Sequence, residues 1–186
     1  MKNVVIVGMK LFAICAIAAL TLGGINAITE PVIIQRKIME LQQALNELTP
    51  DAQTGEAVSV SENPVIVKRY PVTKEGQSAG MLLELEGSGY GGEMKILARY
   101  EADGTIRAVK LMDNTETPGL GKKAENPAYM EKFIGTGSAD NPVAVRKDML
   151  GPGDADAITG ATITFLGISK ALAEGAQYAA EVSGGE

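Results

Sequence analysis

The sequence predicts an N-terminal transmembrane helix followed by an α+β domain, in which helices pack on an antiparallel sheet. Two observations support this fold class. Residues 11–29 carry no charge, and a membrane-spanning helix needs about 20 predominantly apolar residues. Beyond residue 63, segments of alternating apolar side chains are separated by turn residues, and the last segment has apolar residues at helical spacing. A chain of 186 residues has room for one such domain with its own core.

The composition argues against nucleic-acid binding and against metal chemistry. The formal net charge is −6 and the pI is about 4.8, whereas nucleic-acid-binding proteins need clusters of Lys and Arg. The chain has no histidine and a single cysteine, Cys15. The commonest general base and metal ligand is therefore missing, and a Cys-ligated iron–sulfur cluster cannot form. We predict no catalytic residue and no metal site, so redox chemistry would need an organic cofactor.

Residues 1–30 form the predicted membrane anchor. Lys2 and Lys10 precede the uncharged span, and Glu30 is the first charge after it. The positive-inside rule then places the N-terminus in the cytoplasm and the rest of the chain on the extracytoplasmic side of the cell membrane, in a single-pass topology. The basic pair at residues 36–37 lies on the extracytoplasmic side and counts against this orientation.

Residues 31–50 form a predicted amphipathic stalk helix. Pro31 suits its first turn and Thr49-Pro50 its end. A signal peptide cleaved near Ala27 is the alternative to a permanent anchor. The helical pattern that follows the span favours the anchor, because apolar residues continue three or four apart at Ile34, Ile38, Leu41, Leu45 and Leu48.

Residues 51–186 form the predicted extracytoplasmic domain, which begins with a polar loop at residues 51–62. Asp103-Gly104 is a hairpin signal between two of the predicted strands. The pattern predicts strands at residues 65–70, 81–86, 94–101, 105–112 and 143–147, and helices at residues 126–134 and 163–182.

Three glycine-bearing segments do not match ordinary turns. They lie at residues 87–92, 116–121 and 156–162. Glycine lets a backbone approach a ligand closely, because no Cβ stands in the way. One such segment alone would indicate a plain loop, but three of them favour a shared ligand.

The third segment suits an anion beside a threonine hydroxyl. Thr159 or Thr162 can cap the helix predicted to begin near Ile163. The start of a helix offers unpaired N–H groups and the positive end of its dipole, where a phosphate binds well. Gly160 and Ala161 leave space beside the hydroxyls. A helix cap without a ligand is the alternative.

This segment also carries a resemblance to a known family. Asp156, Thr159, Gly160, Ala161 and Thr162 match the Asp-x-x-Ser/Thr-Gly-Ala-Thr signature of covalent flavinylation. In that reaction a flavin transferase moves FMN from FAD onto the last threonine as a phosphoester. The chain resembles the G subunit of the Rnf complex, an ion-translocating ferredoxin:NAD oxidoreductase. The C subunit of the sodium-translocating NADH:quinone reductase is a relative of that family.

The resemblance extends over nearly the whole chain. It includes the single N-terminal span, the Asn-Ala-Ile-Thr-Glu-Pro exit at residues 26–31, Gly-Tyr-Gly-Gly at residues 89–92 and Glu-Thr-Pro-Gly-Leu-Gly at residues 116–121. It implies cofactor-binding roles for Tyr90, Glu116, Thr117, Gly119 and Leu120 near the isoalloxazine ring, with Lys147 as a charge partner.

One position departs from the family pattern. Relatives often have a small polar residue after the position of Thr164, whereas this chain has Phe165. Phe165 packs either on the flavin or in the core, and we expect the core.

The resemblance implies an electron-carrier subunit rather than a catalyst on its own. Its partners would be the flavin transferase and the other subunits of an Rnf complex, including a second membrane subunit with covalent FMN and iron–sulfur subunits. The sequence leaves two alternatives open. One is a stand-alone extracytoplasmic flavinylated electron carrier, and the other is an anchored scaffold module without redox chemistry.

Overall fold

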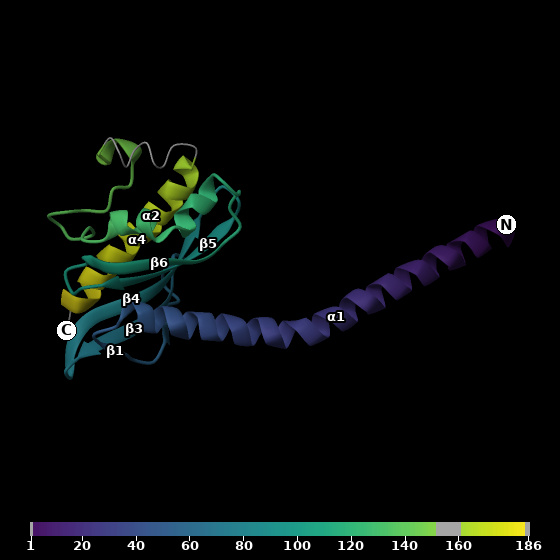
Figure 1. Cartoon of the computed structure of the whole chain (residues 1–186), viewed down its shortest axis with the longest axis horizontal. Helices are drawn as coiled ribbons and strands as arrows, with labels where there is room; N and C mark the ends of the chain where they lie inside the picture. The colour runs from purple at the N-terminus through teal and green to yellow at the C-terminus, as the bar shows by residue number, and fades with distance from the viewer. Residues whose placement is uncertain (1, 152–160, 185–186) are drawn as a thin grey trace. The chain divides into compact units, whose positions relative to one another are not determined.

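The computed structural model describes residues 2–151 and 161–184 (Figure 1). The chain divides into two compact units, Met1–Gln42 and Gln43–Glu186. The first unit is made of helix α1 (Lys2–Leu48), whose last residues belong to the second. The stretch Val4–Leu48 is long and apolar enough to cross a membrane. Large apolar side chains such as Phe12 and Leu20 are more than 70% exposed along it, as expected of a lipid-facing helix.

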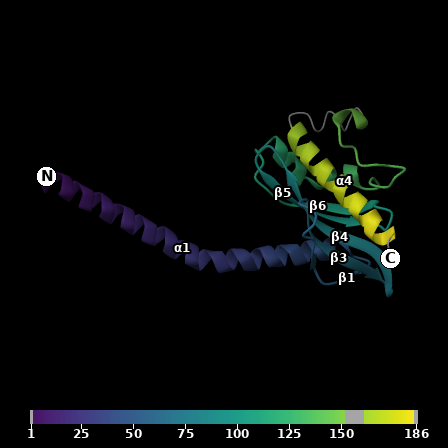
Figure 2. The same ribbon diagram turned by 180° about the vertical axis from the view of Figure 1, so that it is seen from behind.

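Helix α1 continues without a break through the predicted junction of anchor and stalk. The sequence suggested that a second helix starts at Pro31, but Pro31 lies inside one continuous helix. A proline removes one backbone hydrogen bond and bends a helix without ending it when its neighbours keep helical geometry. Figures 1 and 2 show the helix bending partway along its length.

The second unit is built on an antiparallel sheet. Its main strands follow one another as a meander, which confirms the first four predicted strands: β3 (Ile66–Lys74), β4 (Gln77–Ser88), β5 (Glu93–Tyr100) and β6 (Ile106–Asn114). Two short strands, β1 (Gln53–Thr54) and β2 (Val58–Ser59), pair with β3 where a loop was predicted. Each of these strands is only two residues long, too short for a period to reveal it. Their pairing uses the free backbone groups of β3.

The turn between β5 and β6 lies where the sequence predicted it. Gly104 has a φ of 86°, and the N–H of Glu101 donates to the carbonyl of Thr105 at 2.9 Å. The carboxylate of Asp103 accepts from the N–H of Thr105 at 2.9 Å. The β3–β4 turn at Glu75-Gly76, with φ angles of 53° and 80°, has the left-handed pair that a two-residue hairpin needs.

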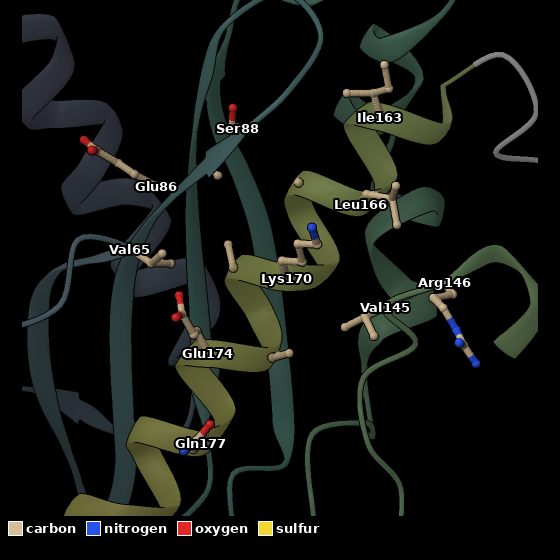
Figure 3. Close-up of a pocket in the computed structure, with 14 residues that line it drawn as sticks. Val65, Glu86, Ser88, Val145, Arg146, Ile163, Leu166, Lys170, Glu174 and Gln177 are labelled. Atoms are coloured by element: carbon tan, nitrogen blue, oxygen red, sulfur yellow. The ribbon is translucent and has the colours of Figure 1, made fainter.

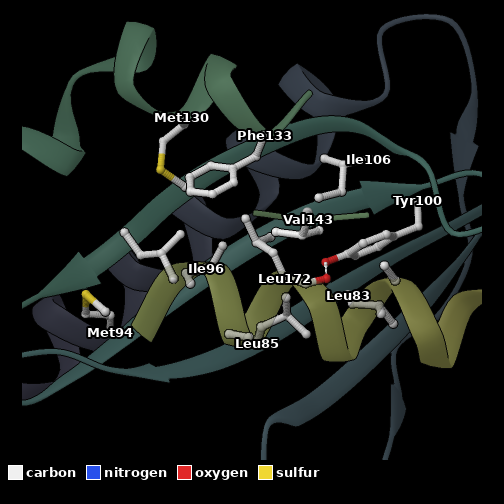
Figure 4. Packing of buried hydrophobic residues seen from close by; sticks show 14 of the residues in the cluster. Leu83, Leu85, Met94, Ile96, Tyr100, Ile106, Met130, Phe133, Val143 and Leu172 are labelled. Atoms are coloured by element: carbon white, nitrogen blue, oxygen red, sulfur yellow. Dashed lines mark hydrogen bonds between the residues drawn. The ribbon is translucent and has the colours of Figure 1, made fainter. Parts of the chain in front are cut away.

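Helix α4 (Thr162–Gly184) crosses one face of the sheet (Figure 2) and confirms the last predicted helix. The core lies between them (Figure 4), with Leu83, Leu85 and Ile96 from the strands and Leu172 from the helix. Phe165 is fully buried and stacks on Phe133, with ring centroids 5.8 Å apart. Phe165 therefore belongs to the core.

The segment after β6 adds short helices beside the core. These are η1 (Gly121–Glu125), α2 (Pro127–Met130) and η2 (Glu131–Phe133), and the last two form the helix predicted at residues 126–134. The strand predicted at residues 143–147 is wrong. Residues 143–146 have no regular structure, and Lys147 begins η3 (Lys147–Met149). Val143 is buried in the core, so its segment is apolar because of packing and not because of strand pairing.

The other face of the sheet is joined to the last turn of α1. Ala44 and Leu48 are buried there, and Lys110 of β6 pairs with Glu47. Arg99 of β5 donates to the Leu48 carbonyl at 3.4 Å and to the Asp51 carboxylate at 2.7 Å. Both faces of the central strands are thus covered.

Candidate functional site

A pocket of about 380 Å³ lies where three separate segments meet. These are the β4–β5 loop, the segment after β6 and the first turn of α4. Its volume is within the roughly 300–1,000 Å³ of small-molecule sites. Its lining includes six of the predicted site residues and three further ones: Tyr90, Glu116, Thr117, Leu120, Gly121, Ala161, Thr162, Ile163 and Thr164.

Glu116 joins the three segments. Its side chain is 3% exposed. Oε1 accepts from the N–H of Gly91 at 3.0 Å, and Oε2 accepts from the hydroxyl of Thr164 at 2.8 Å. Gly89 and Gly121 flank the carboxylate, and a Cβ at either position would lie 2.0 Å from one of its oxygens. The glycines of the first two segments therefore leave room for this carboxylate.

Asn114 holds the backbone that carries Glu116. Its Oδ1 accepts from the N–H of Glu116, and its Nδ2 donates to Oε1 of Glu125, both at 3.0 Å. This hydrogen bond, followed by one from Lys122, holds the pKa of Glu125 below its ordinary value. The hydroxyl of Thr115 donates to the Gly91 carbonyl at 2.8 Å. These hydrogen bonds hold the β4–β5 loop against the segment after β6, next to the pocket.

The first turn of α4 forms the third wall. The carbonyl of Ala161 accepts from the N–H of Phe165 at 2.9 Å, so the helix starts at Thr162. Thr162 is exposed, whereas Ala161 and Thr164 are buried. The first N–H groups of a helix have no partner within it and lie at the positive end of the helix dipole. The pocket therefore combines an accessible hydroxyl with a place for an anion.

The other predicted residues lie at different distances from this pocket. Tyr90 is 75% and Leu120 48% exposed at its mouth. Gly119 adopts a φ of 79° in the neighbouring turn and does not line the pocket. Lys147 starts η3 and is not part of the lining either. Asp156, Thr159 and Gly160 lie outside the described residues.

Three lining residues were not predicted, namely Gly121, Ile163 and Thr164. Gly121 ends the second glycine segment, so its place in that segment was a usable signal. Thr164 gave none, because its role depends on a glutamate 48 positions earlier in the chain.

A larger groove of about 870 Å³ runs along α4 (Figure 3). Apolar side chains such as Val65 and Leu166 line it, together with the charged residues Glu86, Lys170 and Glu174. It touches the first pocket only through Ile163. None of the predicted site residues that the structure describes lines it, so the smaller pocket is the candidate site.

The smaller pocket suits FMN. A flavin needs apolar surface for its ring, and Leu120, Ile163 and the ring of Tyr90 provide it. Its phosphate suits a helix N-terminus, and Thr162 adds a hydroxyl there. The buried Glu116 carboxylate accepts from the Gly91 N–H and the Thr164 hydroxyl, so each of its oxygens already has a donor.

Comparisons with known proteins match the domain that contains this pocket. Residues 89–177 match the family described as FMN-binding domain, and this range contains every residue that lines the pocket. The chain is 31% identical to the G subunit of the Na(+)-translocating ferredoxin:NAD(+) oxidoreductase complex of Acetobacterium woodii, over 97% of this chain and 92% of the relative. It is 31% identical to the G subunit of the ion-translocating oxidoreductase complex of Methanosarcina acetivorans, over 98% of each chain.

A third relative is the G subunit of the proton-translocating ferredoxin:NAD(+) oxidoreductase complex of Clostridium ljungdahlii. It is 25% identical over 92% of this chain and 89% of its own. The similarity thus extends from the apolar helix to the end of α4. The chain belongs to the family of G subunits of ion-translocating ferredoxin:NAD oxidoreductases, the Rnf complexes.

Proposed function

We propose that this chain is an electron-transfer subunit of a membrane-bound, ion-translocating ferredoxin:NAD oxidoreductase and carries FMN bonded to Thr162. One observation carries the proposal. The pocket of the FMN-binding domain lies at the first residue of α4, where Thr162 is exposed. The full-length similarity to the G subunits of such complexes supports the role in electron transfer.

The attachment forms one bond and breaks one. The Thr162 hydroxyl oxygen bonds to the phosphorus of the FMN moiety of FAD. The pyrophosphate bond breaks, AMP leaves with its electron pair, and the hydroxyl proton is released. A flavin transferase is the partner for this step. Asp156, Thr159, Gly160 and Ala161 complete the recognition motif around the acceptor. The ester keeps the ligand at a high local concentration, so little noncovalent affinity is needed.

The remaining residues orient the cofactor. Thr117 contributes a hydroxyl and Leu120 an apolar side chain from the segment after β6, and Tyr90 contributes a ring from the β4–β5 loop. Gly119 shapes the turn next to Leu120, and Lys147 is proposed as a charge partner beyond the lining. FMN supplies one- and two-electron redox chemistry.

The pocket supports a carrier rather than a catalyst. The chain contains no histidine. Among the described residues of the lining, Glu116 is the one carboxylate, and it is held by Gly91 and Thr164. General acid–base catalysis needs a group that is free to exchange a proton with a substrate. The other Rnf subunits, including a second FMN-bearing membrane subunit and iron–sulfur subunits, would deliver and accept the electrons.

The proposed topology follows from the charges around the apolar helix. Residues 1–30 comprise the cytoplasmic N-terminus and the anchor, and residues 31–50 continue α1 as a stalk. Residues 51–186 then form the FMN domain on the extracytoplasmic side. Lys2 and Lys10 before the uncharged span support this orientation in the cell membrane.

Mass spectrometry of the peptide that contains Thr162 tests the attachment. We expect the mass of a phosphoester-linked FMN on Thr162 in protein produced together with a flavin transferase. Thr162→Ala should abolish the flavin band in a denaturing gel, and Thr164→Ala should retain it. A covalent flavin that survives in Thr162→Ala would disprove the assignment, and its absence from the unaltered chain would favour a scaffold without redox chemistry.

A further inference from the structure

We infer that Glu116 and Thr164 form a buried clamp that turns Thr162 toward the pocket and so makes it the flavin acceptor. Both are positioning residues, since they act through the first turn of α4. This inference rests on the proposed attachment at Thr162, and it adds a function for two residues that are not in the flavinylation motif.

The clamp is enclosed and its hydrogen-bonding groups are paired. Glu116 is 3% and Thr164 1% exposed. The Thr164 hydroxyl donates to Oε2 at 2.8 Å while the Gly91 N–H donates to Oε1 at 3.0 Å. Hydrogen bonds to an ionised acceptor are among the stronger ones in proteins. Losing the hydroxyl would leave one carboxylate oxygen buried without this donor, which is costly.

Helix geometry connects the clamp to the acceptor. An α-helix turns about 100° per residue, so two residues that are two positions apart point in nearly opposite directions. Fixing Thr164 against Glu116 therefore sets the rotation of the first turn. It keeps Thr162 on the exposed side of the helix, where its side chain lines the open part of the pocket. The burial agrees, because Thr162 is exposed and Thr164 is not. The same contact also explains why the flavin is not attached to Thr164, since the Thr164 hydroxyl is enclosed and already donates to a carboxylate.

The clamp also sets the position of the first turn against the other walls. The inward-facing Phe165 fixes the helix on the core through Phe133. The Glu116 carboxylate bonds at once to the start of the helix and to the Gly91 loop, so it ties these two walls together. Without it, we expect Thr162 to sample several directions instead of one.

Initial rates of flavinylation test this inference. The full-length chain, free of flavin, is incubated with flavin transferase and FAD, and in-gel fluorescence follows the product. Thr164→Val, which keeps the shape and loses the hydroxyl, should react about tenfold more slowly, equivalent to about 1.4 kcal/mol. Thr164→Ser, which keeps the hydroxyl, should restore the rate. In both variants, peptide mass spectrometry should still find the flavin on Thr162.

Hydrogen exchange of the flavin-free protein gives a second readout that does not depend on the cofactor. Amides at the start of α4 should exchange faster in Thr164→Val than in Thr164→Ser. If circular dichroism shows that Thr164→Val is unfolded, Thr164→Ala takes its place with the same expectation. A folded variant without the hydroxyl that reacts and exchanges like the unaltered chain would overturn the clamp. Absence of flavin on Thr162 in the unaltered chain would instead overturn the proposed function, and the exchange result would still report on the clamp.

Discussion

Arg99 is a cation inside the domain, and the carboxylate of Asp51 pairs with it near the surface. Its side chain is 8% exposed, and Nη1 lies 2.7 Å from Oδ1 of Asp51. Lys74 contacts the other oxygen of Asp51 at 3.0 Å. The hydrogen bonds from Arg99 and then from Lys74 hold the pKa of Asp51 well below its ordinary value of 3.8. A buried charge that loses its partner is strongly unfavourable, so Asp51 matters more than a surface ion pair usually does.

This pair predicts a pH-dependent contribution to stability. A carboxyl group whose pKa is lowered by folding stabilises the protein above its unfolded pKa, and the contribution is lost as the pH falls toward the folded pKa. Asp51→Asn should therefore lower the melting temperature at pH 7, and the difference from the unaltered chain should shrink as the pH falls below the ordinary pKa of 3.8.

Thermal unfolding of residues 43–186 between pH 7 and pH 2 is the measurement. Asp148→Asn serves as the control, because Asp148 and its partner Arg146 are each 70% exposed and such pairs contribute little. A difference for Asp51→Asn that stays constant over this range would show that its ionisation is not responsible.

Residue roles could be predicted from the sequence only where a local motif carried them. Thr162 and Leu120 belong to short motifs, and both line the pocket. Glu116 was predicted as a flavin contact, whereas its described contacts are to Gly91 and Thr164. That role depends on backbone segments that come together only in the folded domain, which no spacing in the sequence reveals.

The docking of α4 on the sheet depends on two glycines of the helix. A Cβ on Gly167 would lie 2.1 Å from the Ser88 carbonyl oxygen, and one on Gly175 would lie 2.4 Å from the Tyr100 hydroxyl oxygen. That hydroxyl donates to the Leu172 carbonyl at 3.0 Å and is fully buried, and burial raises the pKa of Tyr100. The helix thus loses intrinsic helix propensity at both positions and gains close contact with β4 and β5.

Gly175→Ala should therefore destabilise the domain by about 1–3 kcal/mol, as is typical of overpacking in a tight core. The better helix propensity of alanine, about 1 kcal/mol, should not compensate. Urea unfolding of residues 43–186 measures the change. Gly184→Ala at the end of the same helix is the matched control, because nothing lies within 4 Å of its added Cβ. Equal stability of the two variants would contradict the close-contact explanation.

Long elements were predictable because their apolar residues follow burial in the core. Strands β4 and β5 and helix α4 all appear at the predicted places. The errors share a different cause. The strand expected at residues 143–147 is an apolar segment that packs without pairing, since residues 135–136 already exchange backbone hydrogen bonds with Ile106 of β6. Strands β1 and β2 are only two residues long and were too short to be recognised from a period.

The whole molecule combines a helix with exposed apolar residues and a domain with its own core. These two units bury their residues differently. Most apolar side chains of α1 before Gln43 are exposed, whereas those of the sheet and α4 form one cluster. The sequence predicted this division, because membrane insertion needs only length and hydrophobicity. It could not predict the continuous path through Pro31, which depends on the helix tolerating a missing hydrogen bond.

The orientation of the chain in the membrane can be tested by labelling with a membrane-impermeant reagent. In a Cys15→Ala background, Glu181→Cys places a thiol on an exposed position of α4, and Asn3→Cys places one before the span. With Lys2 and Lys10 on the cytoplasmic side, a membrane-impermeant maleimide should label Glu181→Cys in intact spheroplasts. Asn3→Cys should react only after lysis. Labelling of Asn3→Cys alone in intact spheroplasts would reverse the orientation, and a mature N-terminus after Ala27 would identify the apolar segment as a cleaved signal peptide.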